Sequence, residues 1–439
     1  MANRIYLCLA HMSEAGLEQK YIQEAFDTNW VAPLGPNVNG FEEDLKAFVG
    51  QGKEVVALTT GTAAVHLSLI ACGVEPGDEV ITQSFTFCAS AHPVTYLGAT
   101  PVFVDSEKET WNMDPDLLEE AIKDRIAKTG KKPKVIMPVA LYGMPYQIDR
   151  ILEIANRYDI PVVEDAAEGF GSRYDGQVLG TFGRYGILSF NGNKMITTSG
   201  GGALICPNKE EGDRVMWYAT QARESYPYYQ HETIGYNYRM SNICAGIGRG
   251  QMTIVNEHIA HHQHVHQLYV ELFSKIDGIE VHSQPANGRY ASNYWLTSIT
   301  IDENLKIKGQ ENAYKEIITS PVGGVPAVIH AASSARTDCQ PNDNVEALRM
   351  ALEKAGIESR PLWKPMHKQP VYCRTNEKLG MRNEELSHGI IRQTSATSVA
   401  YVNGVSESIF KKGMCLPAGP WVKDEDVKRI VETIKANII

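Results

Sequence analysis

A lysine and an aspartate each stand at the end of a short apolar segment, where a buried strand would deliver its last side chain. Lys194 lies in GILSFNGNKMITTSGGG (186–202), in which an apolar run ends in a polar loop and a glycine-rich turn follows. A buried lysine is more easily held as the neutral, nucleophilic amine than a surface lysine. Asp165 ends a second apolar segment, PVVED (161–165), 29 residues before Lys194.

These two residues together indicate pyridoxal phosphate as the cofactor. Its aldehyde requires an amine, and its pyridinium nitrogen requires a carboxylate partner. The chain between Asp165 and Lys194 is long enough for a crossover between two strands of one sheet. Both side chains can therefore meet at the carboxyl ends of neighbouring strands, where ligands collect in such sheets.

Other candidate cofactor contacts have alternative interpretations that the residues alone leave open. TTGTAA (59–64) precedes a helix and could hold a phosphate with its free N–H groups, or could simply cap the helix. Ser189 could add a hydroxyl to the same phosphate. One phenylalanine of SFTF (84–87) could stack on a flat ring or pack in the core. Glu168 could face the cofactor's phenolic oxygen or solvent.

The remaining pattern predicts an α/β fold. Short apolar runs at 54–59, 79–85, 100–105, 134–141, 161–165, 186–190 and 202–206 alternate with amphipathic windows such as 114–128 and 147–157. This alternation is typical of a mainly parallel sheet with helices on both faces, giving three layers. Helices are also expected at 14–28 and 41–49, within and after an N-terminal arm.

The alternation ends near residue 250, which predicts a division into a large domain (1–255) and a smaller C-terminal domain (256–439). The second domain is expected to begin with a connector helix over 252–276. A half-buried strand (293–302) and two helices (345–356 and 423–438) should follow, and residues 303–344 are loop-rich without a predicted role.

The connector helix carries His258, His262 and His266 at positions i, i+4 and i+8. This spacing could seat a metal ion. No acidic or cysteine ligand completes a site in the same helical register, so the interpretation adopted is a solvated polar face without a metal.

Composition excludes several classes of protein. A net charge of −10 argues against a nucleic-acid partner. No apolar run approaches the length of a membrane span, and the first residues, MANRIYLCLAHM, do not have the pattern of a signal peptide. The eight cysteines include no CxxC pair and read as reduced residues of a cytoplasmic protein.

Six motifs together resemble one family: GTAAVHLSL, SFTF, VALYGMP with EDAAE, SFNGNK, GYNYRMSN and RPLWKPMH. Their order and spacing are similar to those of the DegT/StrS-type sugar-nucleotide aminotransferases, within pyridoxal phosphate fold type I. The resemblance extends from about residue 4 to the C-terminus. NWVAPLGPN and RPLWKPMH particularly resemble the branch that acts on UDP-4-keto-6-deoxy-N-acetylhexosamines. The fold implied is three-layer and aspartate-aminotransferase-like, with a smaller C-terminal α+β domain.

The resemblance also implies roles for individual residues. Lys194 would form the internal aldimine and carry the proton, Asp165 would pair with the ring nitrogen, and Phe87 would stack on the ring. Asn237 would reach the phosphate of the neighbouring subunit, which implies an obligate homodimer with shared sites. Glu168 departs from the glutamine or histidine that is common in the family at the position next to the cofactor oxygen. The phosphate would be held by Gly61, Thr62, Ala63 and Ser189.

RPLWKPMH would bind the sugar nucleotide through Arg360, Trp363, Lys364 and His367, although the two prolines could equally mark a structural turn. The implied reaction moves an amino group from L-glutamate to the C4 keto group of a nucleotide-linked 6-deoxy sugar. A 3-keto-sugar aminotransferase remains an alternative. A dehydratase of the family would have histidine in place of Lys194, and a non-catalytic relative should have lost Lys194 or Asp165. The product's C4 stereochemistry, the nucleotide and the pathway stay open.

Overall fold

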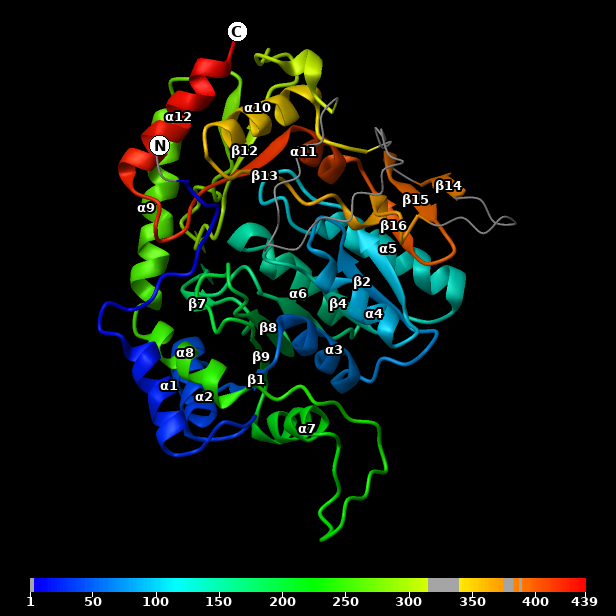
Figure 1. Cartoon of the computed structure of the whole chain (residues 1–439). Coiled ribbons are helices and arrows are strands. Elements are labelled where there is room, and N and C mark those ends of the chain that lie inside the picture. Colours follow the sequence, from blue (N-terminus) through cyan, green and yellow to red (C-terminus); the bar gives the residue numbers. More distant parts are fainter. Residues whose placement is uncertain (1–3, 315–338, 374–381, 387–388) are drawn as a thin grey trace.

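A mainly parallel sheet forms the centre of the chain. The computed structural model describes residues 4–314, 339–373, 382–386 and 389–439 (Figure 1). Strands β4 and β5 are joined through parallel bridges at Ile136–Val162 and Val139–Asp165. β9 pairs antiparallel with both of its neighbours. The resulting order is β16 (Val399–Val402), β3 (Thr100–Val104), β2 (Glu79–Gln83), β4 (Val135–Met137), β5 (Val163–Asp165), β8 (Tyr185–Ser189), β9 (Gly202–Cys206) and β1 (Glu54–Leu58). Beyond β16 the sheet continues with two antiparallel strands, β15 (Ile391–Thr394) and β14 (Arg382–Glu385).

Two hydrophobic clusters lie on opposite faces of this sheet, because successive side chains of a strand point to opposite faces. Val55 and Ala57 of β1 belong to one cluster, and Val56 and Leu58 belong to the other. α3 (Gly61–Ala71) and α7 (Lys209–Ala219) contribute to the second cluster. The first takes residues from α2 (Pro36–Val49), α5 (Pro115–Thr129), α6 (Ile148–Arg157) and α8 (Asn242–Met252). The predicted three-layer α/β fold is confirmed.

The ends of these elements agree with the sequence pattern to within about three residues, except that α2 begins five residues before the predicted helix, β4 ends four residues before the predicted run, and the pattern differs near residue 250. The segment expected as one helix over 252–276 is divided between the end of α8 and a separate helix, α9 (Val255–Phe273). The segment between β5 and β8 holds a two-stranded hairpin, β6 (Arg173–Tyr174) and β7 (Gln177–Val178). β5 and β8 nevertheless pair in parallel, as the crossover requires.

A further core lies in the C-terminal part, where α9 and two helices cover a small antiparallel sheet. The division at residue 255 remains a proposal, and β16 pairs with β3 across it. Most of the loop-rich segment 303–344 lies outside the described residues. The helices of this core are α9, α10 (Asp343–Lys354) and α12 (Asp424–Asn437), and its strands are β10 (Ile279–Val281), β12 (Thr297–Ile301), β17 (Gly413–Leu416) and β13 (Arg360–Pro361).

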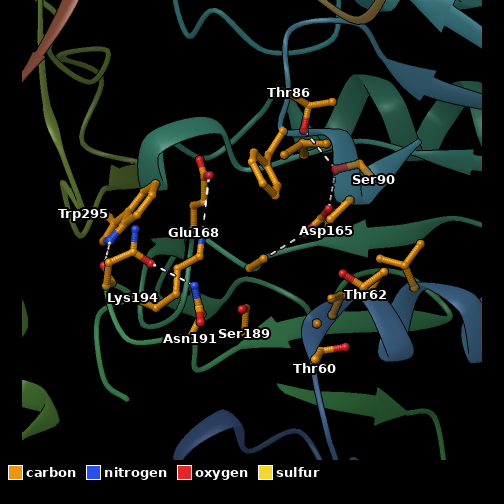
Figure 2. Close-up of a pocket in the computed structure, with 18 of the residues that line it drawn as sticks. Thr60, Thr62, Thr86, Ser90, Asp165, Glu168, Ser189, Asn191, Lys194 and Trp295 are labelled. Carbon is orange, nitrogen blue, oxygen red and sulfur yellow. Dashed lines mark hydrogen bonds and ion pairs between the residues drawn. The ribbon is translucent and has the colours of Figure 1, made fainter. Parts of the chain in front are cut away.

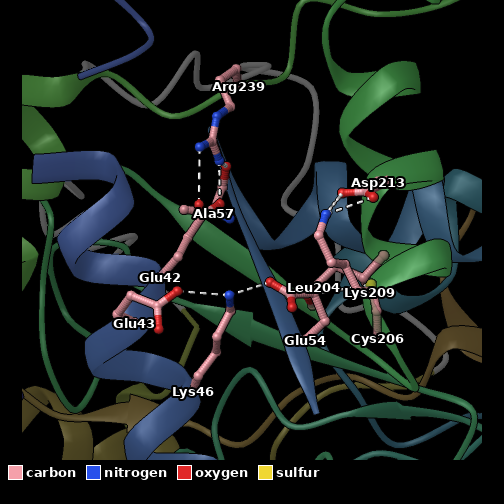
Figure 3. Close-up of polar contacts among 10 residues, drawn as sticks. All are labelled: Glu42, Glu43, Lys46, Glu54, Ala57, Leu204, Cys206, Lys209, Asp213 and Arg239. Atoms are coloured by element: carbon pink, nitrogen blue, oxygen red, sulfur yellow. Dashed lines mark hydrogen bonds and ion pairs between the residues drawn. The ribbon is translucent and has the colours of Figure 1, made fainter. Parts of the chain in front are cut away.

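A buried ion pair fastens α2 to the edge strand β1 (Figure 3). The Glu42 carboxylate pairs with the Arg239 guanidinium through both of its oxygens, and Oε1 also accepts the Ala57 N–H at 2.8 Å. Arg239 Nη1 donates to the Ala57 carbonyl at 3.0 Å. The exposed side of α2 carries a second link, in which Lys46 pairs with Glu43 and Glu54. These contacts hold the strand that leads into the TTGTAA turn.

The histidines of α9 do not form a solvated face, so that interpretation was wrong. His258, His262 and His266 are 4%, 0% and 3% exposed. Two of them form hydrogen bonds to segments outside α9. His258 Nδ1 donates to the Met195 carbonyl, and His262 Nδ1 donates to the Tyr294 carbonyl. Within the described residues, no group of three or more histidine, cysteine or acidic side chains is arranged to hold a metal ion.

No helix in the described part of the chain combines the length and the apolar character that a membrane span requires.

Candidate active site

A cavity of about 230 Å³ opens at the carboxyl ends of β1, β5 and β8 (Figure 2). The loops that leave these strands line it with side chains from sequence segments more than a hundred residues apart. Predicted site residues among the lining are Gly61, Thr62, Phe87, Asp165, Glu168, Ser189, Lys194 and Trp363. The sheet therefore brings together most of the candidate cofactor contacts, as expected for this class of fold.

The Lys194 amine points into this cavity from the loop after β8. Nζ lies 3.4 Å from Glu168 Oε1 and 3.9 Å from the centre of the Trp295 ring. The Lys194 side chain is 13% exposed. The backbone N–H of Lys194 donates to the Asn191 carbonyl, so a tight turn holds the residue at the strand end. A mostly buried amine next to a cavity can act as a nucleophile.

Asp165 ends β5 and is 5% exposed. Its Oδ2 accepts the Ser90 hydroxyl at 2.6 Å and its Oδ1 accepts the Ala167 N–H at 3.1 Å. Ser90 Oγ is in turn 2.9 Å from Thr86 Oγ1. Burial raises the pKa of Asp165, while Ser90 and Ala167 oppose the rise. A cation in the cavity would stabilise this carboxylate, and a pyridinium N–H fits that requirement.

The start of α3 forms an anion cradle at the other side of the cavity. Helix N-termini leave their first N–H groups without intrahelical partners, and here Gly61 and Thr62 line the cavity. The Thr60 hydroxyl caps the helix by accepting the Ala63 N–H at 2.9 Å, so this N–H is already engaged, and Ala63 is not among the lining residues. A Cβ on Gly202 would lie 2.4 Å from the Gly61 nitrogen, so only glycine allows the 200–202 turn to pack here.

Glu168 lines the cavity and is 5% exposed, which excludes the solvent-facing position, while its contact with the cofactor oxygen stays a prediction. Its Oε2 accepts the Tyr142 N–H at 2.7 Å. Burial raises the pKa of Glu168, and the positive charge of Lys194 acts against that rise. Tyr142 has a positive φ of 53°, and its hydroxyl accepts the Trp363 N–H at 2.8 Å. This constrained tyrosine therefore connects Glu168 to the predicted substrate segment.

Phe87 and Trp363 flank the opening of the cavity, with ring centres 5.3 Å apart. Phe87 is 49% exposed, so it is not the core residue that the alternative interpretation required. A second cavity of about 340 Å³ adjoins the first and shares Thr86, Phe87 and Trp363 with it. Lys364 lines this second cavity.

Three further predicted residues lie outside both cavities. Arg360 pairs with Glu358 at 2.9 Å. His367 is buried with Nδ1 2.6 Å from the Ser84 hydroxyl, and burial lowers its pKa to about 4. Asn237 is exposed in a backbone bridge with Thr220, and its predicted contact with a neighbouring subunit stays a prediction.

Sequence reasoning missed Trp295, Ser90 and Thr86 as lining residues. Ser90 has no sequence signal, because it follows SFTF in a short 3₁₀ turn, Cys88–Ser90. Trp295 was counted with a half-buried strand, whereas that strand begins only at Thr297. Large aromatic residues just before a strand are more often core residues than site residues, so only the fold could identify it.

Comparison with known proteins agrees with this geometry. The profile of the DegT/DnrJ/EryC1/StrS aminotransferase family matches residues 13–319. The putative pyridoxal phosphate-dependent aminotransferase EpsN of Bacillus subtilis is 40% identical, over 99% of this chain and 96% of that protein. The GDP-perosamine synthase of Escherichia coli O157:H7 is 31% identical, over 98% of each chain.

The crystal structure of a DegT/DnrJ/EryC1/StrS aminotransferase from Brucella abortus superimposes with a TM-score of 0.76 at 25% identity, covering 96% of this chain and 95% of that one. The buried carboxylate, the amine and the anion cradle fit pyridoxal phosphate. The chain therefore belongs to the DegT/DnrJ/EryC1/StrS aminotransferase family, a family of pyridoxal phosphate-dependent sugar aminotransferases.

Proposed function

We propose that this protein transfers an amino group from L-glutamate to the C4 keto group of a nucleotide-linked 4-keto-6-deoxy sugar. The expected acceptor is a UDP-2-acetamido-2,6-dideoxy-4-ketohexose. The observation that carries the proposal is the position of the Lys194 amine, which shares one cavity with the buried Asp165 carboxylate and the start of α3. The GDP-perosamine synthase among the relatives supports a nucleotide-sugar acceptor.

Each of these residues has a distinct task in this proposal. Bound pyridoxal phosphate supplies the aldehyde and the electron sink that amino transfer requires. Lys194 Nζ acts as the nucleophile and then carries the proton between the two carbon atoms involved. Asp165 holds a proton at the ring nitrogen, with Ser90 and Ala167 fixing the carboxylate. Gly61, Thr62 and Ser189 bind the phosphate, and Phe87 covers the ring face.

The sugar nucleotide is proposed to enter along Trp363 and Lys364. The buried indole Nε1–H of Trp363 has no acceptor within the described residues, so a ligand oxygen could satisfy it. Lys364 lines the adjoining cavity and can neutralise a diphosphate. Arg360 and His367 complete the proposed segment, and the buried His367 would act by fixing the Ser84 loop.

Asn237 is proposed to complete the site of a partner subunit, which makes the active unit a homodimer. Its exposed side chain on a bridged backbone supports this. Mixing Lys194→Ala with Asn237→Ala subunits tests it, because a mixed dimer regains one intact site. We expect each variant to be inactive by itself, the mixture to be active, and light scattering to give the mass of a dimer. Monomers at working concentration would contradict the proposal.

The first test is the visible absorption of the purified protein with pyridoxal phosphate, before and after L-glutamate. Wild type should show a yellow band that glutamate bleaches, and Lys194→Ala should lack it. Incubation with UDP-4-keto sugars and NMR of the product then identify the aminated carbon. Amination at C3 would support the alternative 3-keto-sugar aminotransferase. A colourless wild type would contradict the proposed role of Lys194 and favour a non-catalytic relative.

A further inference from the structure

Trp295 is the aromatic residue in contact with the Lys194 amine. The centre of its ring is 3.9 Å from Lys194 Nζ, and the Trp295 side chain is only 1% exposed (Figure 2). A cation over the face of an indole ring is attracted by the ring quadrupole, and the attraction is stronger when water is excluded. The amine also contacts the Glu168 carboxylate at 3.4 Å.

The same tryptophan is also bound to the backbone of the lysine loop. Its indole Nε1–H donates to the carbonyl of Asn193, the residue immediately before Lys194, at 2.6 Å. Trp295 therefore contacts Lys194 at two points, at the amine and at the peptide that precedes it. Such a two-point contact restricts both the path of the loop and the direction of the side chain.

Trp295 is itself held by the segment that carries Glu168. The backbone N–H of Trp295 donates to Asn293 Oδ1 at 2.9 Å, and Asn293 Nδ2 donates to the carbonyls of Glu168 and Phe170, both at 2.9 Å. The carbonyl of Tyr294 accepts from His262 on α9. The ring position is thus set by three separate parts of the chain.

We propose that Trp295 is a positioning residue for Lys194. It holds the free amine at the cavity before the cofactor reacts, and again whenever the amine is released during turnover. The inference rests on the proposed role of Lys194, and it adds that the rate at which the amine finds the cofactor aldehyde depends on this indole. A positioning residue of this kind affects the rate of the reaction with the aldehyde, whereas a residue that binds the cofactor itself would change the affinity for the cofactor.

The test separates these two effects. Full-length protein prepared without cofactor is mixed with pyridoxal phosphate in a stopped-flow instrument, and the rise of the visible band is followed. Affinity for 4′-deoxypyridoxine phosphate, which lacks the aldehyde and cannot react with a lysine, is measured separately by calorimetry. The variants are Trp295→Leu and Trp295→Phe. Trp421→Leu is the matched control, because its indole also donates to a backbone carbonyl (Ala10, 2.9 Å) but lies outside the site.

We expect Trp295→Leu to slow the rise of the band about tenfold, because both the ring contact and the hydrogen bond are lost. Trp295→Phe should slow it about threefold, since it keeps a ring face but not the donor. Affinity for the analogue should stay within about twofold of wild type in every variant, and Trp421→Leu should behave as wild type.

An unchanged rate in Trp295→Leu would overturn the inference while leaving the proposed function standing. A loss of analogue affinity as large as the loss of rate would also overturn it, by making Trp295 part of the cradle. If Trp295→Leu proves unfolded in a thermal melt, the smaller change in Trp295→Phe decides. A wild type that forms no band would instead overturn the role of Lys194 itself.

Discussion

Two buried ion pairs in this protein are built in opposite ways. Glu42 and Arg239 meet through both carboxylate oxygens, and each also bonds the backbone of Ala57 (Figure 3). Glu168 and Lys194 meet through one 3.4 Å contact at the wall of a cavity (Figure 2). Both pairs connect parts of the chain that are distant in sequence or lie on different loops.

The two pairs differ in how many of their hydrogen-bonding groups already have a partner within the protein. In the Glu42–Arg239 pair the polar groups are used by each other and by β1, so the pair contributes to the fold. In the Glu168–Lys194 pair the amine contacts one carboxylate oxygen and the face of the Trp295 ring, so it makes fewer hydrogen bonds than Arg239 does. An amine with few hydrogen bonds can be positioned and still be available to react, at the cost of an incompletely compensated buried charge.

Replacing Lys194 should have the largest effect on activity and a small effect on the fold. We expect Lys194→Ala to lower the rate of amino transfer about ten-thousandfold or more, because it removes both the nucleophile and the proton carrier. Rates with L-glutamate and the visible spectrum provide the measurement. Lys209→Ala, which removes only an exposed lysine paired with Asp213, is the control. Activity of Lys194→Ala near that of wild type would contradict the different roles assigned to the two ion pairs.

Replacing Arg239 should show the opposite pattern. Arg239→Leu leaves Glu42 buried without its partner, so we expect the free energy of unfolding to fall by about 3–5 kcal/mol. Urea denaturation measures this change. Arg184→Leu, which breaks an exposed pair with Glu211, should cost less than about 1 kcal/mol. Folded Arg239→Leu protein should still form the visible band at low temperature; loss of the band without loss of stability would contradict a structural role.

Lowering the pH should destabilise the protein through α9. Burial lowers the pKa of His262 to about 3 and that of His266 to about 4. The unfolded chain therefore takes up protons first, and stability falls as the pH drops below about 6.5. Each such histidine should contribute about 1.4 kcal/mol per pH unit in that range. His262→Asn should flatten the profile. The exposed His264→Asn should leave it unchanged, and equal slopes in both variants would contradict the burial argument.

Replacing Glu168 by glutamine should give the smallest change, in the stabilising direction. Burial raises the pKa of Glu168, so the folded protein carries its charge at a cost once the pH exceeds the unfolded value. Glu168→Gln should raise the free energy of unfolding at pH 7, and the gain should vanish near pH 4, where the unfolded carboxyl group is protonated. Matched urea curves at the two pH values test this, and a loss of stability at pH 7 would show that the Lys194 contact outweighs burial.

Much of the parallel sheet could be predicted because most of its strands are short apolar runs, and a polar residue stands at or just after the end of β1, β2, β3, β5 and β8. Asp165 and Lys194 were identifiable for the same reason, since a charged side chain at the end of a buried run needs a partner. Thr60 and Gly61 were identifiable as a strand-to-helix turn. These are local signals, contained within a few residues of each other.

The remaining features depend on contacts that no local pattern encodes. The spacing of His258, His262 and His266 defines one face of α9, but whether that face is solvated or buried depends on where Met195 and Tyr294 lie. The pairing of β16 with β3 joins strands about 300 residues apart.

The sequence by itself therefore determined the fold class and the candidate residues for the chemistry, because hydrophobic periodicity and the polarity of strand ends are properties of short segments. Only the tertiary structure decided that Ser90 supports Asp165 and that Trp295 lies against Lys194. Serine and tryptophan are compatible with many environments, and packing between distant segments selects one of them.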